Sequence, residues 1–173
     1  MAEQELLICE AQPEDADSLA ETLKMVQEES DFLTRDSNSS AMSQKQVRDF
    51  ILQQGQKNNA ICLVAKVGDK VVGLLNVAGN DFSGTEHIGE IFIAVRSAYQ
   101  GYGIGSYLME TLIDWAENTP QVRRLELDVQ VRNTKAVHLY QKFGFAIEGT
   151  KKRGAKTKNG EFLDVYAMAR LMD

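Results

Sequence analysis

Apolar residues in the first third of the chain are spaced to form one short strand and two amphipathic helices. We expect the strand at residues 6–9, and Pro13 opens the first helix because the missing N–H of proline does no harm in a first turn. Helical spacing continues through Leu19, Leu23 and Val26. Ser43 and Gln46 fit a capping box ahead of the second helix, whose apolar positions are Val47, Phe50 and Ile51. The polar segment 31–40 is a predicted loop.

The middle of the chain is patterned as three strands. Residues 60–66 and 71–77 read as a hairpin that turns at Gly68 and Asp69, a favoured pair for a tight turn. Residues 90–95 form a third strand that is apolar after Glu90, as expected of a strand covered on both faces.

A third helix and an alternating strand follow a glycine-rich turn at 100–106. One face of this helix has the apolar residues Ile104, Leu108, Leu112 and Trp115, and Thr119-Pro120 ends it. From 124 to 131 apolar and polar residues alternate. Leu125, Leu127, Val129 and Val131 point to one side, and Glu126, Asp128 and Gln130 point to the other.

The last elements are a helix and a hairpin. Asn133 and Thr134 are placed to cap a helix that Gly144 ends, with the apolar face Ala136, Leu139, Tyr140 and Phe143. Strands at 145–152 and 161–171 would turn at Asn159-Gly160. The order β-α-α-β-β-β-α-β-α-β-β predicts a mixed α/β (α+β) fold of about seven strands and four helices, in one domain over 1–173.

Composition narrows the function classes. The chain has 173 residues, 43% of them hydrophobic and 25% charged, with a formal net charge of −6. A nucleic-acid binder needs a basic footprint, and a bilayer span needs roughly 20 consecutive apolar residues, so neither partner is expected. The acidic N-terminal 17 residues do not resemble a signal peptide. Two cysteines cannot form a disulfide framework and suit a reducing, cytoplasmic location.

The turn from Gln100 to Ser106 is the most informative segment for function. Glycines at 101, 103 and 105 leave backbone N–H groups unshielded where a helix begins, and such a site binds phosphate oxygens. A dinucleotide fingerprint would need a glycine where Ser106 stands, and a P-loop would need a lysine. A glycine-rich turn without a ligand stays an open alternative.

Two motifs here resemble those of the GNAT superfamily of N-acetyltransferases. Gln100-x-x-Gly103-x-Gly105 is similar to the Q/R-x-x-G-x-G/A motif, and the run from Asn133 to Phe145 is similar to N-x-x-A-x-x-x-Y-x-x-x-G-F. The resemblance covers about residues 60–171. It implies the GNAT acyl-CoA N-acyltransferase fold and acetyl-CoA as cosubstrate. The implied coenzyme-binding residues are Ile93, Val95, Gln100, Gly101, Tyr102, Gly103, Ile104, Gly105, Ser106 and Asn133.

The resemblance also implies where the chemistry occurs. Strands 90–95 and 124–131 would be parallel neighbours that splay apart, with main-chain groups of Ile93 and Val95 holding the pantetheine arm. Tyr140 matches the tyrosine that protonates the coenzyme A thiolate, although its spacing also suits a core aromatic. Asn133 would contact the coenzyme or cap its helix. The first helical region would shape the acceptor pocket.

An amine must be neutral before it attacks a thioester, so the reaction needs a general base. Glu90 is the candidate, because it opens the apolar strand 90–95 and the resemblance to the histone-type branch of the family implies a basic glutamate on this strand. A solvated charge at a strand end and a chain of water molecules are the alternatives. His87 and His138 are read as surface residues, Cys9 and Cys62 as structural thiols, and Lys151–Lys158 as a solvated hairpin or a contact for the 3′-phosphate. No spacing of ligands suggests a metal site.

The expected function is transfer of an acetyl group from acetyl-CoA to the primary amine of a small molecule by direct attack. The segment from Gly160 to Met168 resembles the branch that acetylates amino acids, polyamines and amine-bearing antibiotics or herbicides. The alternatives are acetylation of a protein N-terminus, as in ribosomal-protein acetyltransferases, and a non-catalytic acyl-CoA-binding module. A homodimer is expected from the family.

Overall fold

The computed structural model describes residues 4–33 and 42–173, and its elements follow the predicted order. These are β1 (Leu6–Glu10), α1 (Ala16–Glu29), α2 (Gln44–Gln56), β2 (Ile61–Val67), β3 (Lys70–Gly79), β4 (Ile88–Val95), α3 (Ile104–Glu117), β5 (Arg124–Gln130), α4 (Thr134–Lys142), β6 (Ala146–Lys156) and β7 (Phe162–Leu171). Residues 34–40 of the predicted loop lie outside the described residues. The fold expectation is confirmed.

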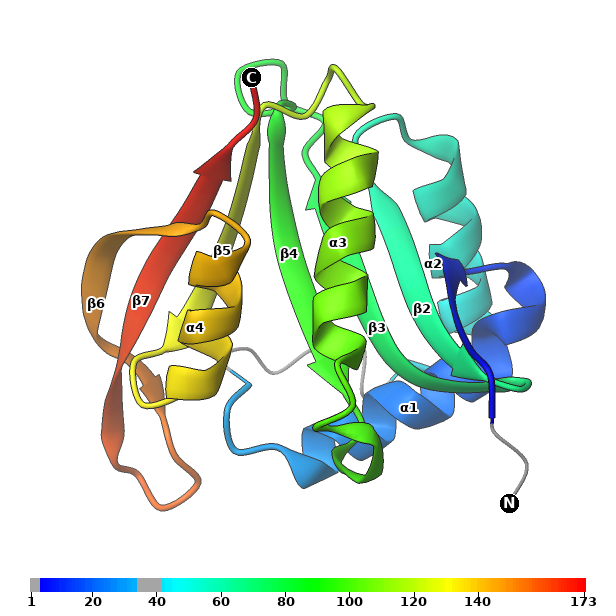
Figure 1. Ribbon diagram of the computed structural model, residues 1–173, viewed down its shortest axis with the longest axis horizontal. Helices are drawn as coiled ribbons and strands as arrows, with labels where there is room; N and C mark the ends of the chain where they lie inside the picture. The colour runs from blue at the N-terminus through cyan, green and yellow to red at the C-terminus, as the bar shows by residue number, and fades with distance from the viewer. Residues whose placement is uncertain (1–3, 34–41) are drawn as a thin grey trace.

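The strands form one sheet with helices on both faces (Figure 1). Its order is β1-β2-β3-β4-β5-β7-β6, and every neighbouring pair is antiparallel except β4 and β5. Helices α3 and α4 pack on one face around Leu108, Leu112 and Tyr140. Helices α1 and α2 pack on the other face around Leu19 and Val47. Each face therefore has its own hydrophobic core.

The parallel pair β4–β5 is connected through α3, as a parallel crossover requires. The two strands pair in only three rungs, from Ile88–Arg124 to Glu90–Glu126. At Gly89 an added Cβ would lie 2.7 Å from a methyl of Val77 and 3.2 Å from one of Leu125, so the strands are close there. β5 stays paired with β7 up to Gln130, whereas β4 stays paired with β3 up to Val95. The sheet therefore opens beyond Glu90, and we call this opening the β4–β5 fork.

Two local expectations differ from the structure. Pro13 begins a short 3-10 turn, Pro13–Asp15, and α1 itself begins at Ala16. The last hairpin does not close in two residues: the N–H of Thr157 donates to the carbonyl of Glu161 (2.8 Å), and Gly160 has φ +85°. A three-residue loop with glycine in the left-handed region suits this closure, because glycine adopts positive φ without a Cβ clash.

Candidate active site

The main chain of β4 presents alternate residues to the fork. The N–H of Arg96 donates to the carbonyl of Val72 on β3 (2.9 Å), so even-numbered residues of β4 face β3. The carbonyl of His87 accepts from Arg123 and Arg124 beside β5, so odd-numbered residues face the other way. Because main-chain groups alternate along a strand, those of Ile93 and Val95 point into the fork.

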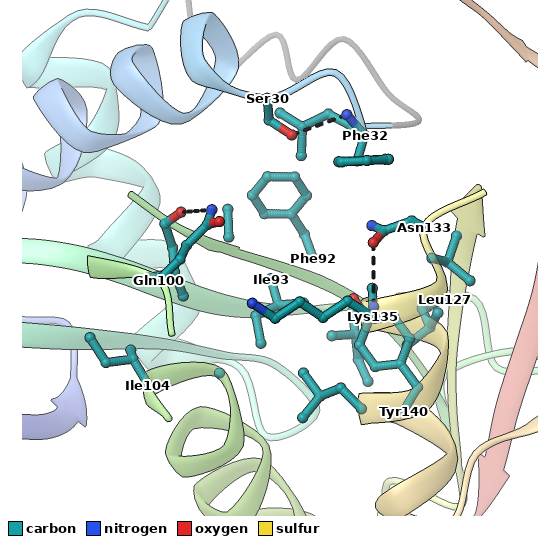
Figure 2. A pocket seen from close by; sticks show the side chains of 18 of the residues that line it. Ser30, Phe32, Phe92, Ile93, Gln100, Ile104, Leu127, Asn133, Lys135 and Tyr140 are labelled. Atoms are coloured by element: carbon teal, nitrogen blue, oxygen red, sulfur yellow. Dashed lines mark hydrogen bonds between the residues drawn. The ribbon is translucent and has the colours of Figure 1, made fainter. Parts of the chain in front are cut away.

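Gln100 fixes the turn that leads from β4 to α3. Its side-chain Nε2 donates to the carbonyl of Val95 over 3.0 Å (Figure 2). The intervening residues Ser97–Tyr99 form a short 3-10 turn. Gln100 thus ties the glycine-rich turn to the end of β4, and its predicted contact with a coenzyme remains a prediction.

The glycine-rich turn delivers the chain into α3 with open N–H groups. Gly101 has φ +86° and Gly103, the N-cap of α3, has φ +82°, so both occupy the left-handed region that favours glycine. A Cβ on Gly105 would lie 3.4 Å from a methyl of Leu139, which brings α3 close to α4. The first turn of α3, described throughout, contains no acidic side chain. This helix end is suited to an anion.

Tyr102 differs from its neighbours in this turn. Its residue is 75% exposed, and it lies outside the set of described residues that line the large cavity, whereas Gly101, Gly103 and Ser106 line it. The predicted contact of Tyr102 with the coenzyme remains a prediction.

α4 presents Asn133 and Tyr140 to the same space. The Asn133 side chain accepts from the N–H of Ala136 (3.3 Å), so it caps the helix, and it also lines the cavity (Figure 2). Tyr140 is 8% exposed and packs on Phe145 with ring centroids 6.2 Å apart. Burial raises the pKa of the Tyr140 phenol to about 12. Tyr140 is therefore both a core residue and a cavity residue.

One cavity of about 820 Å³ runs through the fork and joins the two faces of the sheet. On the α3/α4 side it is lined by the glycine-rich turn, Tyr140 and Asn133; on the α1/α2 side it is lined by Ser30, Phe92 and Glu90, among others. Such a passage lets two molecules enter from opposite faces and meet between the strands.

Glu90 stands at the closed end of the fork. It is the partner of Glu126 in the last rung, and it lines both the large cavity and a smaller one of about 160 Å³. The smaller cavity is also lined by Asp128 and Lys151, whose charged groups lie 2.8 Å apart. This position suits a group that exchanges protons with a bound amine, as predicted, but the assignment remains a prediction.

Several cavity residues were not singled out from the sequence. They are Ser30, Phe32, Asn76, Phe92, Arg132 and Lys135. Strand parity could have indicated Phe92, since it shares the face of Glu90. Figure 2 shows the Lys135 side chain extended across the cavity from α4 toward Gln100. No local pattern could have found Phe32, because its place depends on contacts with β5 and the turn after it.

The remaining candidates divide between cavity and surface. His138 is exposed, as predicted, but also lines the cavity, whereas His87 lies outside the described lining. Both cysteines are free, and burial raises the pKa of Cys62 to about 12, as expected of an inert structural thiol. Lys152 pairs with Asp164 over 3.1 Å, on the solvated hairpin.

Among residues 4–33 and 42–173, no group of three or more His, Cys, Asp and Glu is arranged to hold a metal ion. No helix in those ranges is long and apolar enough to cross a bilayer.

The family model of the Acetyltransferase (GNAT) family matches residues 23–145, which include the fork, the glycine-rich turn and α4. The chain belongs to the GNAT acetyltransferase family. It is 39% identical over 109 residues to the L-amino acid N-acetyltransferase AaaT of Escherichia coli, an alignment that covers 63% of this chain and 67% of that relative.

Solved GNAT structures agree with the whole fold. The acetyltransferase of GNAT family from Streptococcus pneumoniae superposes with a TM-score of 0.93 and 41% identity, covering 97% of this chain and 100% of that one. The structure of yncA from Salmonella typhimurium with its cofactor acetyl-CoA has a TM-score of 0.85 at 19% identity, covering 98% and 95%. At that identity the second likeness shows the fold alone.

Proposed function

We propose that this GNAT acetyltransferase moves an acetyl group from acetyl-CoA to the primary amine of a small molecule, with an amino acid as the leading class of acceptor. The observation that carries the proposal is the single cavity that passes through the β4–β5 fork. It joins a helix end suited to an anion on one face to a separate chamber on the other, lined by Ser30, Phe92 and Glu90, which we call the acceptor chamber. The similarity to an L-amino acid N-acetyltransferase supports the acceptor class.

The residues of the α3/α4 side fit an acyl-coenzyme A. The N–H groups that open α3, with Gly103 and Gly105, suit a diphosphate because they offer donors and no carboxylate. Lys135 and Lys142 line the same side and would supply positive charge to the 3′-phosphate of the coenzyme. Acetyl-CoA supplies the activated acetyl group as a thioester. The main-chain groups of Ile93 and Val95 suit its extended arm.

The transfer balances with the groups at the fork. A neutral amine nitrogen attacks the thioester carbonyl, the C–N bond forms, the C–S bond breaks, and the products are the amide and a thiol. An ammonium substrate is protonated at neutral pH, since its pKa is ~10, so it releases one further proton before the attack. A donor such as the Ile93 N–H would stabilise the transient oxyanion.

Tyr140 is suited to donate a hydrogen bond to the leaving sulfur. A simple thiol has a pKa near ~8.5, whereas that of Tyr140 is raised to about 12, so a phenolate there would be the stronger base. A proton given to the sulfur must therefore be replaced at once. The amine that loses its proton in the same reaction is the natural source.

Glu90 is the proposed group that accepts the first proton from the acceptor ammonium, directly or through water. It lines the acceptor chamber beside Asn76 and Phe92. A carboxylate is a suitable base here because it also attracts the cationic form of the substrate.

Thiol release with separate panels of L-amino acids, polyamines and N-terminal peptides tests the proposal. We expect turnover with free amino acids. Turnover confined to peptides would transfer the proposal to a protein acetyltransferase, and tight acetyl-CoA binding in calorimetry without thiol release on any amine would indicate a binding module. Cytoplasmic location and a homodimer stay predictions; β6, an edge strand whose residues are almost all exposed, is a plausible dimer surface to test.

A further inference from the structure

The segment that follows α1 is hydrogen-bonded to residues at the end of β5 and just beyond it, beside the acceptor chamber. The carbonyl of Asp31 accepts from Arg132 Nη2 over 2.7 Å and from Gln130 Nε2 over 3.3 Å. These contacts join residues 101 and 99 positions apart. Two donors on one carbonyl hold the Asp31–Phe32 segment against the end of β5.

Gln130 orients Arg132. Its Oε1 accepts from Arg132 Nε over 2.7 Å, so one amide binds both the guanidinium and the carbonyl that the guanidinium holds. Gln130 is only 2% exposed. A buried amide that loses its partners is left with unsatisfied polar groups, so this arrangement resists rearrangement.

The segment held in this way presents Phe32 to the cavity. The Arg132 guanidinium lies 5.1 Å from the centroid of the Phe32 ring, and the Phe32 N–H donates to Ser30 Oγ over 3.1 Å. Phe32 is 44% exposed and lines the cavity. Figure 2 shows the Phe92 ring rising from β4 toward Ser30 and Phe32. The guanidinium therefore holds the ring, Ser30 holds the main chain that carries it, and the exposed part of the ring is available to a ligand in the cavity.

We propose that Arg132, oriented by Gln130, is a positioning residue for the acceptor. It fixes Phe32 so that this ring and Phe92 form an apolar wall against which the acceptor's carbon skeleton packs. Arg132 touches no reacting atom in this proposal and acts through Phe32. The proposal rests on the proposed function, because it concerns the acceptor side of the same cavity.

The test is steady-state kinetics of Arg132→Gln with the best acceptor found for the full chain. We expect the KM for the acceptor to rise about tenfold, because two charge-assisted hydrogen bonds, to Asp31 and Gln130, and one ring contact are lost. The KM for acetyl-CoA and kcat should change by less than about threefold. Arg132→Lys should recover only part of the loss, since an ammonium cannot hold both Gln130 and Asp31 in one plane.

Arg153→Gln is the matched control. The Arg153 guanidinium lies 5.0 Å from the Phe162 ring on the β6–β7 hairpin, outside the described lining of the cavity. The same substitution there removes a similar Arg–Phe contact and should leave the acceptor KM unchanged.

Phe32→Ala supplies a second, independent arm. If Arg132 acts through Phe32, the double variant Arg132→Gln/Phe32→Ala should raise the acceptor KM little more than Phe32→Ala alone. Additive effects would overturn the proposal, as would an unchanged acceptor KM or an equal rise in both KM values in Arg132→Gln. Failure of the proposed function is recognised separately, because the unmodified chain would then acetylate no small-molecule amine.

Discussion

Glu90 and Glu126 are partners in the last rung of the parallel β4–β5 ladder, and the two strands separate immediately beyond them. The two carboxylates share a residue type and a rung, but only Glu90 lines the large cavity. Glu126 accepts from Arg124 Nε over 2.8 Å. The last rung therefore pairs the candidate base, Glu90, with a second glutamate that does not line the large cavity.

Glu90→Gln should lower kcat by about 10–100-fold, because an amide cannot accept the proton of the acceptor ammonium. The rate of thiol release at saturating acetyl-CoA and acceptor measures this. Glu126→Gln is the control and should keep the wild-type kcat. Equal losses in the two variants would indicate a general effect of charge at the rung and contradict a base at Glu90.

Tyr140→Phe should lower kcat by about tenfold or more with little change in acetyl-CoA affinity, because the aromatic ring stays and only the hydroxyl that donates to the leaving sulfur is lost. Stopped-flow thiol release and calorimetry measure the two quantities. An unchanged kcat across pH would contradict the donor role.

Tyr140 also predicts a loss of stability at high pH. Its folded pKa is raised to about 12 by burial, above the value near ~10 expected in the unfolded chain. The neutral phenol therefore stabilises the fold fully below about pH 10, and this contribution falls as pH rises toward 12. Urea unfolding at pH 9 and pH 11 should show a smaller decrease for Tyr140→Phe than for wild type, by on the order of 2 kcal/mol at most. Parallel decreases would contradict the shift.

Gly103→Val should abolish measurable acetyl-CoA binding in calorimetry. The residue has φ +82° at the N-cap of α3, and a branched side chain there would fill the space in front of the helix N–H groups. Gly160→Val is the matched control, since Gly160 has φ +85° with open space around it on the distant hairpin. It should lose stability by a similar amount and still bind. Wild-type affinity in Gly103→Val would contradict the phosphate site.

Lys135→Ala should weaken acetyl-CoA binding about three- to tenfold and reduce its dependence on salt, because Lys135 extends across the phosphate side of the cavity (Figure 2). Lys152→Ala removes an equal charge from the β6–β7 hairpin, where Lys152 pairs with Asp164. It should bind as wild type does. Weaker acetyl-CoA binding in Lys152→Ala, with wild-type binding in Lys135→Ala, would indicate that the hairpin lysines contact the 3′-phosphate.

The sequence by itself determined the elements that depend on local contacts. The order of strands and helices, the Ser43–Gln46 capping box, the Asn133 cap and the left-handed glycines of the 100–106 turn all follow from residues within about four positions of one another. Such features are readable because side-chain periodicity and main-chain capping act over one turn.

The tertiary structure alone decided what surrounds the reaction. Three features depend on contacts between residues that are remote in the chain. They are the length of the β4–β5 ladder, the burial of Gln130 and the packing of Phe32 against Arg132. Polar alternation placed Gln130 on the polar side of its strand, yet it is buried there by the segment after α1. Burial of a polar side chain depends on which distant segment crosses it, and periodicity contains no information about that crossing.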